Sequence, residues 1–269
     1  MAYRYHSLNG VHNYLDFVFE KHKKDWDTVI AIVGKVGVGK SNLALHMLEY
    51  WCKKLNGECV PEDIRHMCLN RDDFIKDLAD CKKCEMTIYD EAGDISSRGA
   101  MTEFNRQLMV AYQIIRADNI CTILVLPDIW DLDSYFRNKR IKGLFYVKER
   151  GKVAYFSKKK LERILFINNH RPIKNYFVSN PNFTDSYPIY KGEMKEQYGI
   201  FKDKKVREYR KNLVENSAKK VNEMLELENK LILNMHNKGL NNNEIAKVIE
   251  KSNVTVGRRL KGMTLKVNT

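Results

Sequence analysis

The sequence has no long hydrophobic run: none of its 269 residues lies in a stretch that approaches the roughly 20 consecutive apolar residues needed to cross a bilayer. Its first residues also lack the apolar core of a secretory signal peptide. With six cysteines, the chain has too few for the disulfide framework of a secreted domain. We therefore expect a cytoplasmic protein with mostly free thiols and no membrane segment.

Acidic residues are in the minority. There are 34 Asp and Glu against 47 Lys and Arg, so the formal net charge is +13. Such an excess is typical of proteins that bind a polyanion, although a lysine-rich solvated surface is the common alternative cause. Since one domain usually takes about 100–200 residues, the length predicts one substantial domain and a small second unit.

Zinc-binding cysteine pairs are also scarce. Cys81 and Cys84 form one C-x-x-C pair, with Cys59, His66 and Cys68 upstream as conceivable further ligands. A structural zinc site normally has two tight pairs, and the spacing of Cys59 and Cys68 is not one. We therefore favour a loop with incidental cysteines over a zinc site.

The most informative segment that is present is the glycine-rich run at residues 34–41, which reads G-x-x-x-x-G-K-S. It follows the apolar residues 28–33 and precedes the helix-prone residues 42–48, the context that this motif needs to bind phosphate. Glycines let consecutive backbone N–H groups turn towards a polyphosphate, and a following helix directs its positive end to the same place. The alternative is a glycine-rich turn without a ligand.

The motif predicts ATP and Mg²⁺ as cofactors. Lys40 is expected to reach the β- and γ-phosphates, and Ser41 to hold Mg²⁺. The residues expected to bind the nucleotide are Gly34, Gly37, Val38, Gly39, Lys40, Ser41 and Asn42.

Strand and helix patterns alternate along the first part of the chain. Apolar runs at residues 28–33, 86–89 and 120–126 predict buried strands, and residues 143–147 and 153–156 predict an edge hairpin. Helical patterns lie between them: one reaches about residue 54, and others cover residues 72–80 and 102–116. This alternation predicts an α/β fold with a mostly parallel sheet covered by helices on both faces.

The expected organisation has four parts. They are a lead-in at residues 1–27, a P-loop ATPase core at 28–175, a connecting loop and charged helical segment at 176–225, and a helix-turn-helix DNA-binding domain at 226–269.

Two adjacent carboxylates close the predicted strand at 86–89. Parallel-sheet proteins place ligands at this end of their strands, so Asp90 is expected to hold Mg²⁺ with Ser41. Glu91 is expected to polarise the attacking water. The alternative is an exposed strand end without catalytic function.

Asp128 follows the next strand and is expected to contact the γ-phosphate or the water, with capping of the following segment as the alternative. Arg116 ends a predicted helix, and its planar guanidinium suits a phosphate of a neighbouring subunit in a ring. The competing arginines are Arg98, Arg106, Arg137 and Arg140.

Several of these segments together resemble the HerA/FtsK-type DNA-pumping ATPases, and more particularly the Zot-like and viral DNA-packaging ATPases. The similar segments are residues 34–41, 90–93, 115–119, 126–128 and 132–137, within a similarity that covers about residues 25–160. The resemblance implies a RecA-like P-loop core in a homo-oligomeric ring, with a hexamer favoured, that moves DNA by ATP hydrolysis in the host cytoplasm of a virus or mobile element. The chain departs from these families at Asp128, where they usually have Gln, and it lacks the membrane segment of Zot proteins.

The C-terminal residues predict three short helices at 230–240, 243–250 and 254–261. Ala246 and its apolar neighbours Ile245, Ile249, Val256 and Leu260 stand at core spacing, which is similar to helix-turn-helix domains of the resolvase and sigma-factor kind. The last helix is basic, so the expected DNA contacts are Asn253, Thr255, Arg258, Arg259 and Lys261. A helical bundle that serves oligomerisation is the alternative.

These observations favour an ATP-driven DNA motor, either a translocase or a packaging-type ATPase. Two alternatives stay open. One is an initiator or helicase-loader ATPase similar to AAA+ origin-recognition proteins, and the other is a sequence-specific regulator that uses ATP as an assembly switch.

Overall fold

The computed structural model describes residues 8–90, 106, 110, 118–132, 134, 136–171 and 173–267. The chain divides into two compact units, residues 1–202 and 203–269, and each is described by itself. Among the helices in the described ranges, none is long and apolar enough to pass through a membrane.

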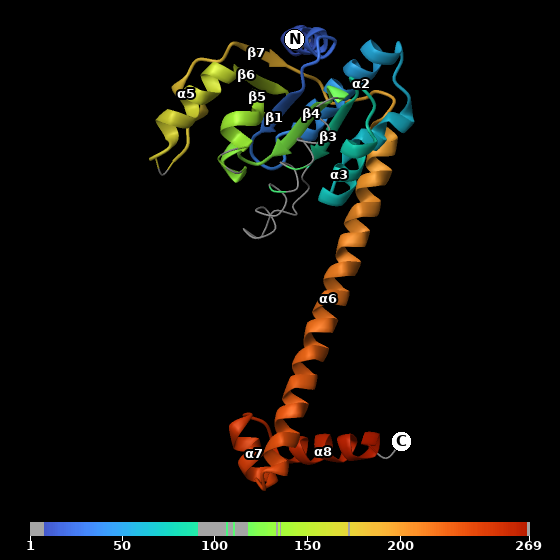
Figure 1. Cartoon of the computed structure of the whole chain (residues 1–269), viewed down its shortest axis with the longest axis vertical. Coiled ribbons are helices and arrows are strands. Elements are labelled where there is room, and N and C mark those ends of the chain that lie inside the picture. The colour runs from blue at the N-terminus through green and yellow to red at the C-terminus, as the bar shows by residue number, and fades with distance from the viewer. Residues whose placement is uncertain are drawn as a thin grey trace, which may run out of the picture. The chain divides into compact units, whose positions relative to one another are not determined.

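A seven-stranded sheet forms the centre of the first unit (Figure 1). Its order is β2 (Met67–Cys68), β3 (Met86–Asp90), β4 (Cys121–Leu126), β1 (Thr28–Val33), β5 (Ile141–Glu149), β6 (Lys152–Ser157) and β7 (Phe183–Ser186). The pairs from β2 to β5 are parallel, and the β5–β6 and β6–β7 pairs are antiparallel. The predicted α/β class with a mostly parallel sheet is therefore confirmed. The predicted hairpin is β5–β6, but its expected place at the edge of the sheet is wrong, because β7 pairs with β6 and forms that edge.

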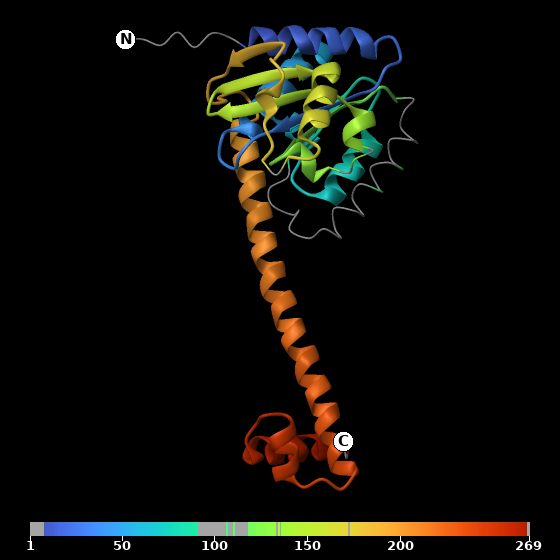
Figure 2. The same cartoon turned by 90° about the vertical axis from the view of Figure 1, so that its left-hand side faces the viewer.

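Helices cover both faces of this sheet (Figures 1 and 2). Ile30 and Ile32 of β1 belong to a buried cluster with α1 (Asn9–His22) and α2 (Lys40–Asn56). The alternate residues Val29, Ala31 and Val33 belong to a second cluster with α3 (Arg71–Asp80) and α5 (Lys158–Asn168). Every residue of β1 is buried, as expected for a central parallel strand with helices on either side. Short helical turns complete the unit at η1 (Pro61–His66), η3 (Ile129–Asp131), η4 (Phe136–Arg140) and η5 (Tyr176–Val178).

Two segments outside the expected core at residues 28–175 also belong to this unit. The lead-in forms α1, whose N-terminus is capped from β7: the carboxylate of Asp185 accepts the N–H groups of Gly10 and Val11 at 2.8 and 3.2 Å. The expected connecting segment contains β7 and contributes the buried side chains of Tyr187, Tyr190 and Met194. A single capping residue or a few separate buried side chains leave no periodic pattern in the sequence, and the residue that caps α1 lies 175 residues away.

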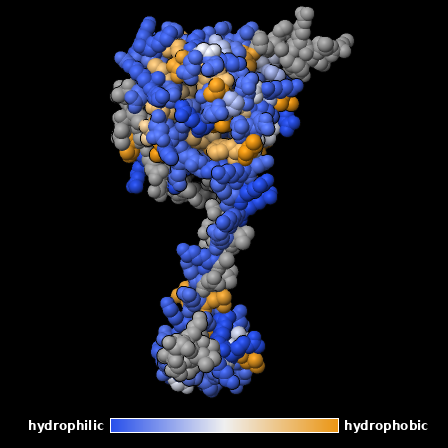
Figure 3. All heavy atoms as spheres, turned by 90° about the vertical axis from the view of Figure 1, so that its right-hand side faces the viewer, coloured by the Kyte–Doolittle hydropathy of each residue, from blue (hydrophilic) through white to orange (hydrophobic). Residues whose placement is uncertain are grey.

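The second unit contains most of α6 (Lys195–Asn237), followed by α7 (Asn242–Val248) and α8 (Asn253–Val267). Its small core consists of Ile232, Ile245, Ala246 and Val256, with Met235, Leu240, Ile249 and Leu260 packed against it. Figure 3 shows that the exposed residues on the pictured face of this unit are mostly hydrophilic.

Candidate functional site

The glycine-rich run forms the turn between β1 and α2, at the carboxyl edge of the sheet. Gly34 has a φ of +149°, and a Cβ atom added there would collide with the carbonyl oxygen of Val147 on β5. Gly39 has a φ of +96° and directly precedes the first residue of α2. The backbone therefore requires glycine at both positions. The Gly34 N–H donates to the carbonyl of Pro127 at 3.2 Å, which attaches the loop to the end of β4.

Lys40 turns back over this loop. Its Nζ donates to the carbonyl oxygens of Gly34 and Lys35 at 2.7 and 3.0 Å. The ammonium group is therefore held beside the turn by acceptors that a phosphate oxygen could replace. The positive end of the α2 dipole adds to the attraction for an anion there.

Ser41 and Asp90 converge on one hydroxyl group, that of Tyr198 in the first turn of α6. Asp90 ends β3 and is 4% exposed, and its Oδ2 accepts a hydrogen bond from the Tyr198 hydroxyl at 2.8 Å. Burial, followed by the nearby Asp90 carboxylate, raises the pKa of Tyr198 well above its usual value, whereas a hydrogen bond with Ser41 opposes this shift. A serine hydroxyl and a carboxylate are oxygen donors of the kind Mg²⁺ prefers, so these two residues fit that ion.

The segment at residues 187–190 is fixed to the loop and to α2. The Tyr187 hydroxyl donates to the carbonyl of Gly39 at 3.1 Å. The Asn42 amide donates to Pro188 O at 2.7 Å and accepts the N–H of Tyr190 at 2.6 Å, so the side chain of Asn42 is committed to this segment. Sequence reasoning missed these contacts and Tyr198, although the unusual density of tyrosines in an apparent loop was a usable signal.

Asp128 caps the short helix η3. Its Oδ1 accepts the Tyr176 hydroxyl at 2.6 Å and the N–H of Trp130 at 3.3 Å, while its own N–H donates to Asp131 Oδ2 at 3.1 Å. The described contacts are thus those of the capping alternative. Contact with a γ-phosphate stays a prediction for Asp128.

Three of the expected catalytic or competing residues lie outside the described residues: Glu91, Arg98 and Arg116. Of the other arginines, Arg106 is exposed. Arg137 donates to two nearby backbone carbonyls at 3.1 and 3.3 Å, and Arg140 pairs with Asp27 at 3.5 Å. The last two are therefore engaged within the subunit.

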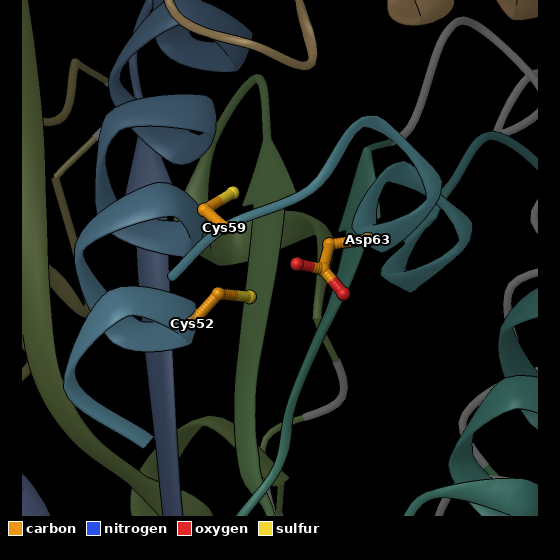
Figure 4. Close-up of side chains that lie close together, drawn as sticks. All are labelled: Cys52, Cys59 and Asp63. Atoms are coloured by element: carbon orange, nitrogen blue, oxygen red, sulfur yellow. The ribbon is translucent and has the colours of Figure 1, made fainter. Parts of the chain in front are cut away.

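The cysteines cluster differently from the C-x-x-C expectation. Among the described residues, two groups have candidate ligand atoms within 4.8 Å of one another: Cys52, Cys59 and Asp63, drawn in Figure 4, and His66, Cys81 and Glu85. Cys84 belongs to neither group. In the second group both ring nitrogens of His66 are engaged, since Nδ1 lies 3.1 Å from the Asp77 carboxylate and Nε2 accepts from Arg65 at 3.2 Å.

Four of the five expected DNA-contacting residues lie on the outer side of α8 or at its start. Asn253, Arg258 and Lys261 are exposed, and Thr255 is half-buried. Ser252 caps this helix by accepting the N–H of Thr255 at 3.2 Å.

Arg259 departs from that expectation. Its Nη1 lies 2.8 Å from Glu228 Oε2 on α6, and the two side chains are 21% and 25% exposed. Arg259 therefore joins α8 to α6, and we do not retain it among the DNA contacts. Val256 and Leu260 pack in the core of this unit, and Arg259, next to Leu260, pairs with α6, whereas Arg258 is exposed to solvent.

Comparison with models of protein families and with curated proteins found no match.

Proposed function

We propose that this chain is an ATP-hydrolysing DNA motor, a translocase or packaging-type ATPase of a virus or mobile element. The observation that carries the proposal is the buried carboxylate of Asp90 at the end of β3, bonded to Tyr198, together with the glycine loop that holds the Lys40 ammonium group and leads into Ser41 of α2. A buried carboxylate, a hydroxyl and a lysine at one edge of a parallel sheet suit a nucleoside triphosphate with its divalent cation.

The nucleotide site would use the loop and the residues that follow it. Backbone N–H groups of residues 35–39 and the start of α2 would favour the phosphates electrostatically, and Lys40 would exchange its two carbonyl acceptors for phosphate oxygens. Ser41 and Asp90 would hold Mg²⁺, which neutralises charge on the β- and γ-phosphates.

Hydrolysis requires a base and charge stabilisation. Glu91 directly follows Asp90, the last residue of β3, and we propose that it accepts a proton from the attacking water. Arg116 is proposed to act on a phosphate bound by a neighbouring subunit. This step requires a homo-oligomeric ring, and a hexamer is favoured.

DNA binding is assigned to α8. Val254, Arg258 and Lys261 are exposed, and their spacing of four and three residues places them on one face of the helix. Arginine and lysine suit phosphates and guanine edges, and an exposed valine suits a thymine methyl group.

The decisive experiment measures steady-state ATP hydrolysis without DNA, with single-stranded DNA and with long duplex DNA, together with the native mass. A motor hydrolyses faster with any long DNA. Tight ATP retention with binding to a defined repeat favours an initiator, and hydrolysis too slow to measure with ATP-dependent protection of one operator favours a regulator.

Two variants test the catalytic residues. Lys40→Ala is expected to abolish hydrolysis, and Glu91→Gln is expected to bind ATP without turning it over. Lys24→Ala, at an exposed lysine beyond the end of α1, is the matched control and is expected to hydrolyse normally. Normal turnover by Glu91→Gln would contradict the assignment of the base.

A further inference from the structure

Tyr198 connects the two proposed metal ligands to the long helix α6. It lies 108 residues after Asp90, is 8% exposed, and reaches both Asp90 and Ser41 with one hydroxyl group. A hydroxyl oxygen 2.8 Å from Asp90 Oδ2 occupies space that a cation bound to this carboxylate needs, since Mg²⁺ takes oxygen ligands at about 2.0–2.1 Å.

We propose that Tyr198 is a latch: its hydroxyl competes with Mg²⁺ for Asp90, and binding of Mg²⁺ with ATP releases it. The inference rests on the proposed function, because it requires a metal–nucleotide complex at Ser41 and Asp90. Tyr198 lies outside the glycine loop, so its release would connect binding of the metal–nucleotide complex to the first turn of α6.

The exchange keeps Asp90 satisfied in both states. A carboxylate that is 4% exposed is costly without a partner, and the Tyr198 hydroxyl supplies one at 2.8 Å. The cation then replaces that hydroxyl as the partner of Asp90. The latch therefore lowers affinity for the metal–nucleotide complex by stabilising the arrangement in which Tyr198 is bonded to Asp90.

The contacts around Tyr198 determine which part of the chain changes when its hydroxyl is released. Residues 188–190 are held on α2 by Asn42, and the side chain of Met194 is fully buried. Tyr198 N–H donates to Met194 O at 2.9 Å in the first turn of the helix. Because the preceding segment is fixed, loss of the hydroxyl contact loosens the turn that carries Tyr198.

The test uses Tyr198→Phe in the full chain, with Tyr50→Phe as the matched control. The Tyr50 hydroxyl also donates to a carboxylate at 2.8 Å, that of Asp16, but Tyr50 belongs to the contacts between α1 and α2. Affinity for adenylyl imidodiphosphate is measured by calorimetry with Mg²⁺ and with EDTA. With Mg²⁺, Tyr198→Phe is expected to bind the analogue about tenfold tighter, because no Tyr198–Asp90 hydrogen bond has to break. In EDTA its affinity for the analogue is expected to equal that of the wild-type protein.

Hydrogen exchange of the wild-type protein provides a second readout that needs no variant. Amides of residues 195–202 are expected to exchange faster when Mg²⁺ and the analogue are bound. Unchanged or weaker Mg²⁺-dependent binding by Tyr198→Phe, or unchanged exchange at residues 195–202, overturns the latch while the proposed function stands. Failure of the wild-type protein to bind the analogue overturns both.

Discussion

The adjacent residues Arg258 and Arg259 offer a sharp test, because the structure gives two neighbouring arginines of one helix different tasks. Arg258 is exposed, whereas Arg259 pairs with Glu228 at 2.8 Å. Replacing each with alanine removes the same charge from α8, so the two variants control for each other. We expect Arg258→Ala to weaken DNA binding and Arg259→Ala to weaken the packing of α8 on α6.

The expected magnitudes follow from these environments. A phosphate contact contributes about 0.9 to the slope of log affinity against log salt, so Arg258→Ala lowers that slope by about this amount. The Arg259–Glu228 pair is more enclosed than a surface pair, and its loss is expected to cost about 1 kcal/mol, a roughly fivefold decrease in the local protection of α8.

Two assays on the full chain separate the effects. Fluorescence anisotropy with duplex DNA at several KCl concentrations gives the affinity and its salt slope, and native-state hydrogen exchange over residues 253–260 gives the local stability. A fall in DNA affinity with Arg259→Ala as large as that with Arg258→Ala, at unchanged exchange, would refute the structural role of Arg259.

Two further predictions concern the first unit. Asp185→Ala removes the acceptor for the Gly10 and Val11 N–H groups, so it is expected to lower the free energy of unfolding by about 1–2 kcal/mol. Urea unfolding measures this change. The control is Asp80→Ala at the exposed end of α3, which is expected to change the free energy of unfolding by less than about 0.5 kcal/mol. Burial raises the pKa of Cys59 to about 11. Since the thiolate is the reactive form, alkylation of Cys59 is expected to accelerate about tenfold per pH unit between pH 8 and pH 10. A rate independent of pH, followed by mass spectrometry of the peptide, would contradict a raised pKa.

The sequence by itself determined the features whose causes are local. The mostly apolar runs at 28–33, 86–90 and 121–126 form strands that are buried along their whole length between the helices on the two sheet faces. The glycine-rich turn could also be predicted, since the positive φ angles of Gly34 and Gly39 are local properties of the backbone. The part of the C-terminal core that α7 and α8 supply was predicted from helical spacing for the same reason, whereas Ile232 of α6 was not predicted.

Only the tertiary structure decided what depends on distant partners. Asp185 caps a helix 175 residues earlier, and Tyr198 joins Asp90 across 108 residues. Arg259 resembles Arg258 in the sequence, but the position of Glu228 on α6 decides its role. A sequence pattern shows which residues of one helix or strand share a face. A single hydrogen bond or ion pair between distant elements forms only when the chain packs, so no such pattern reveals it.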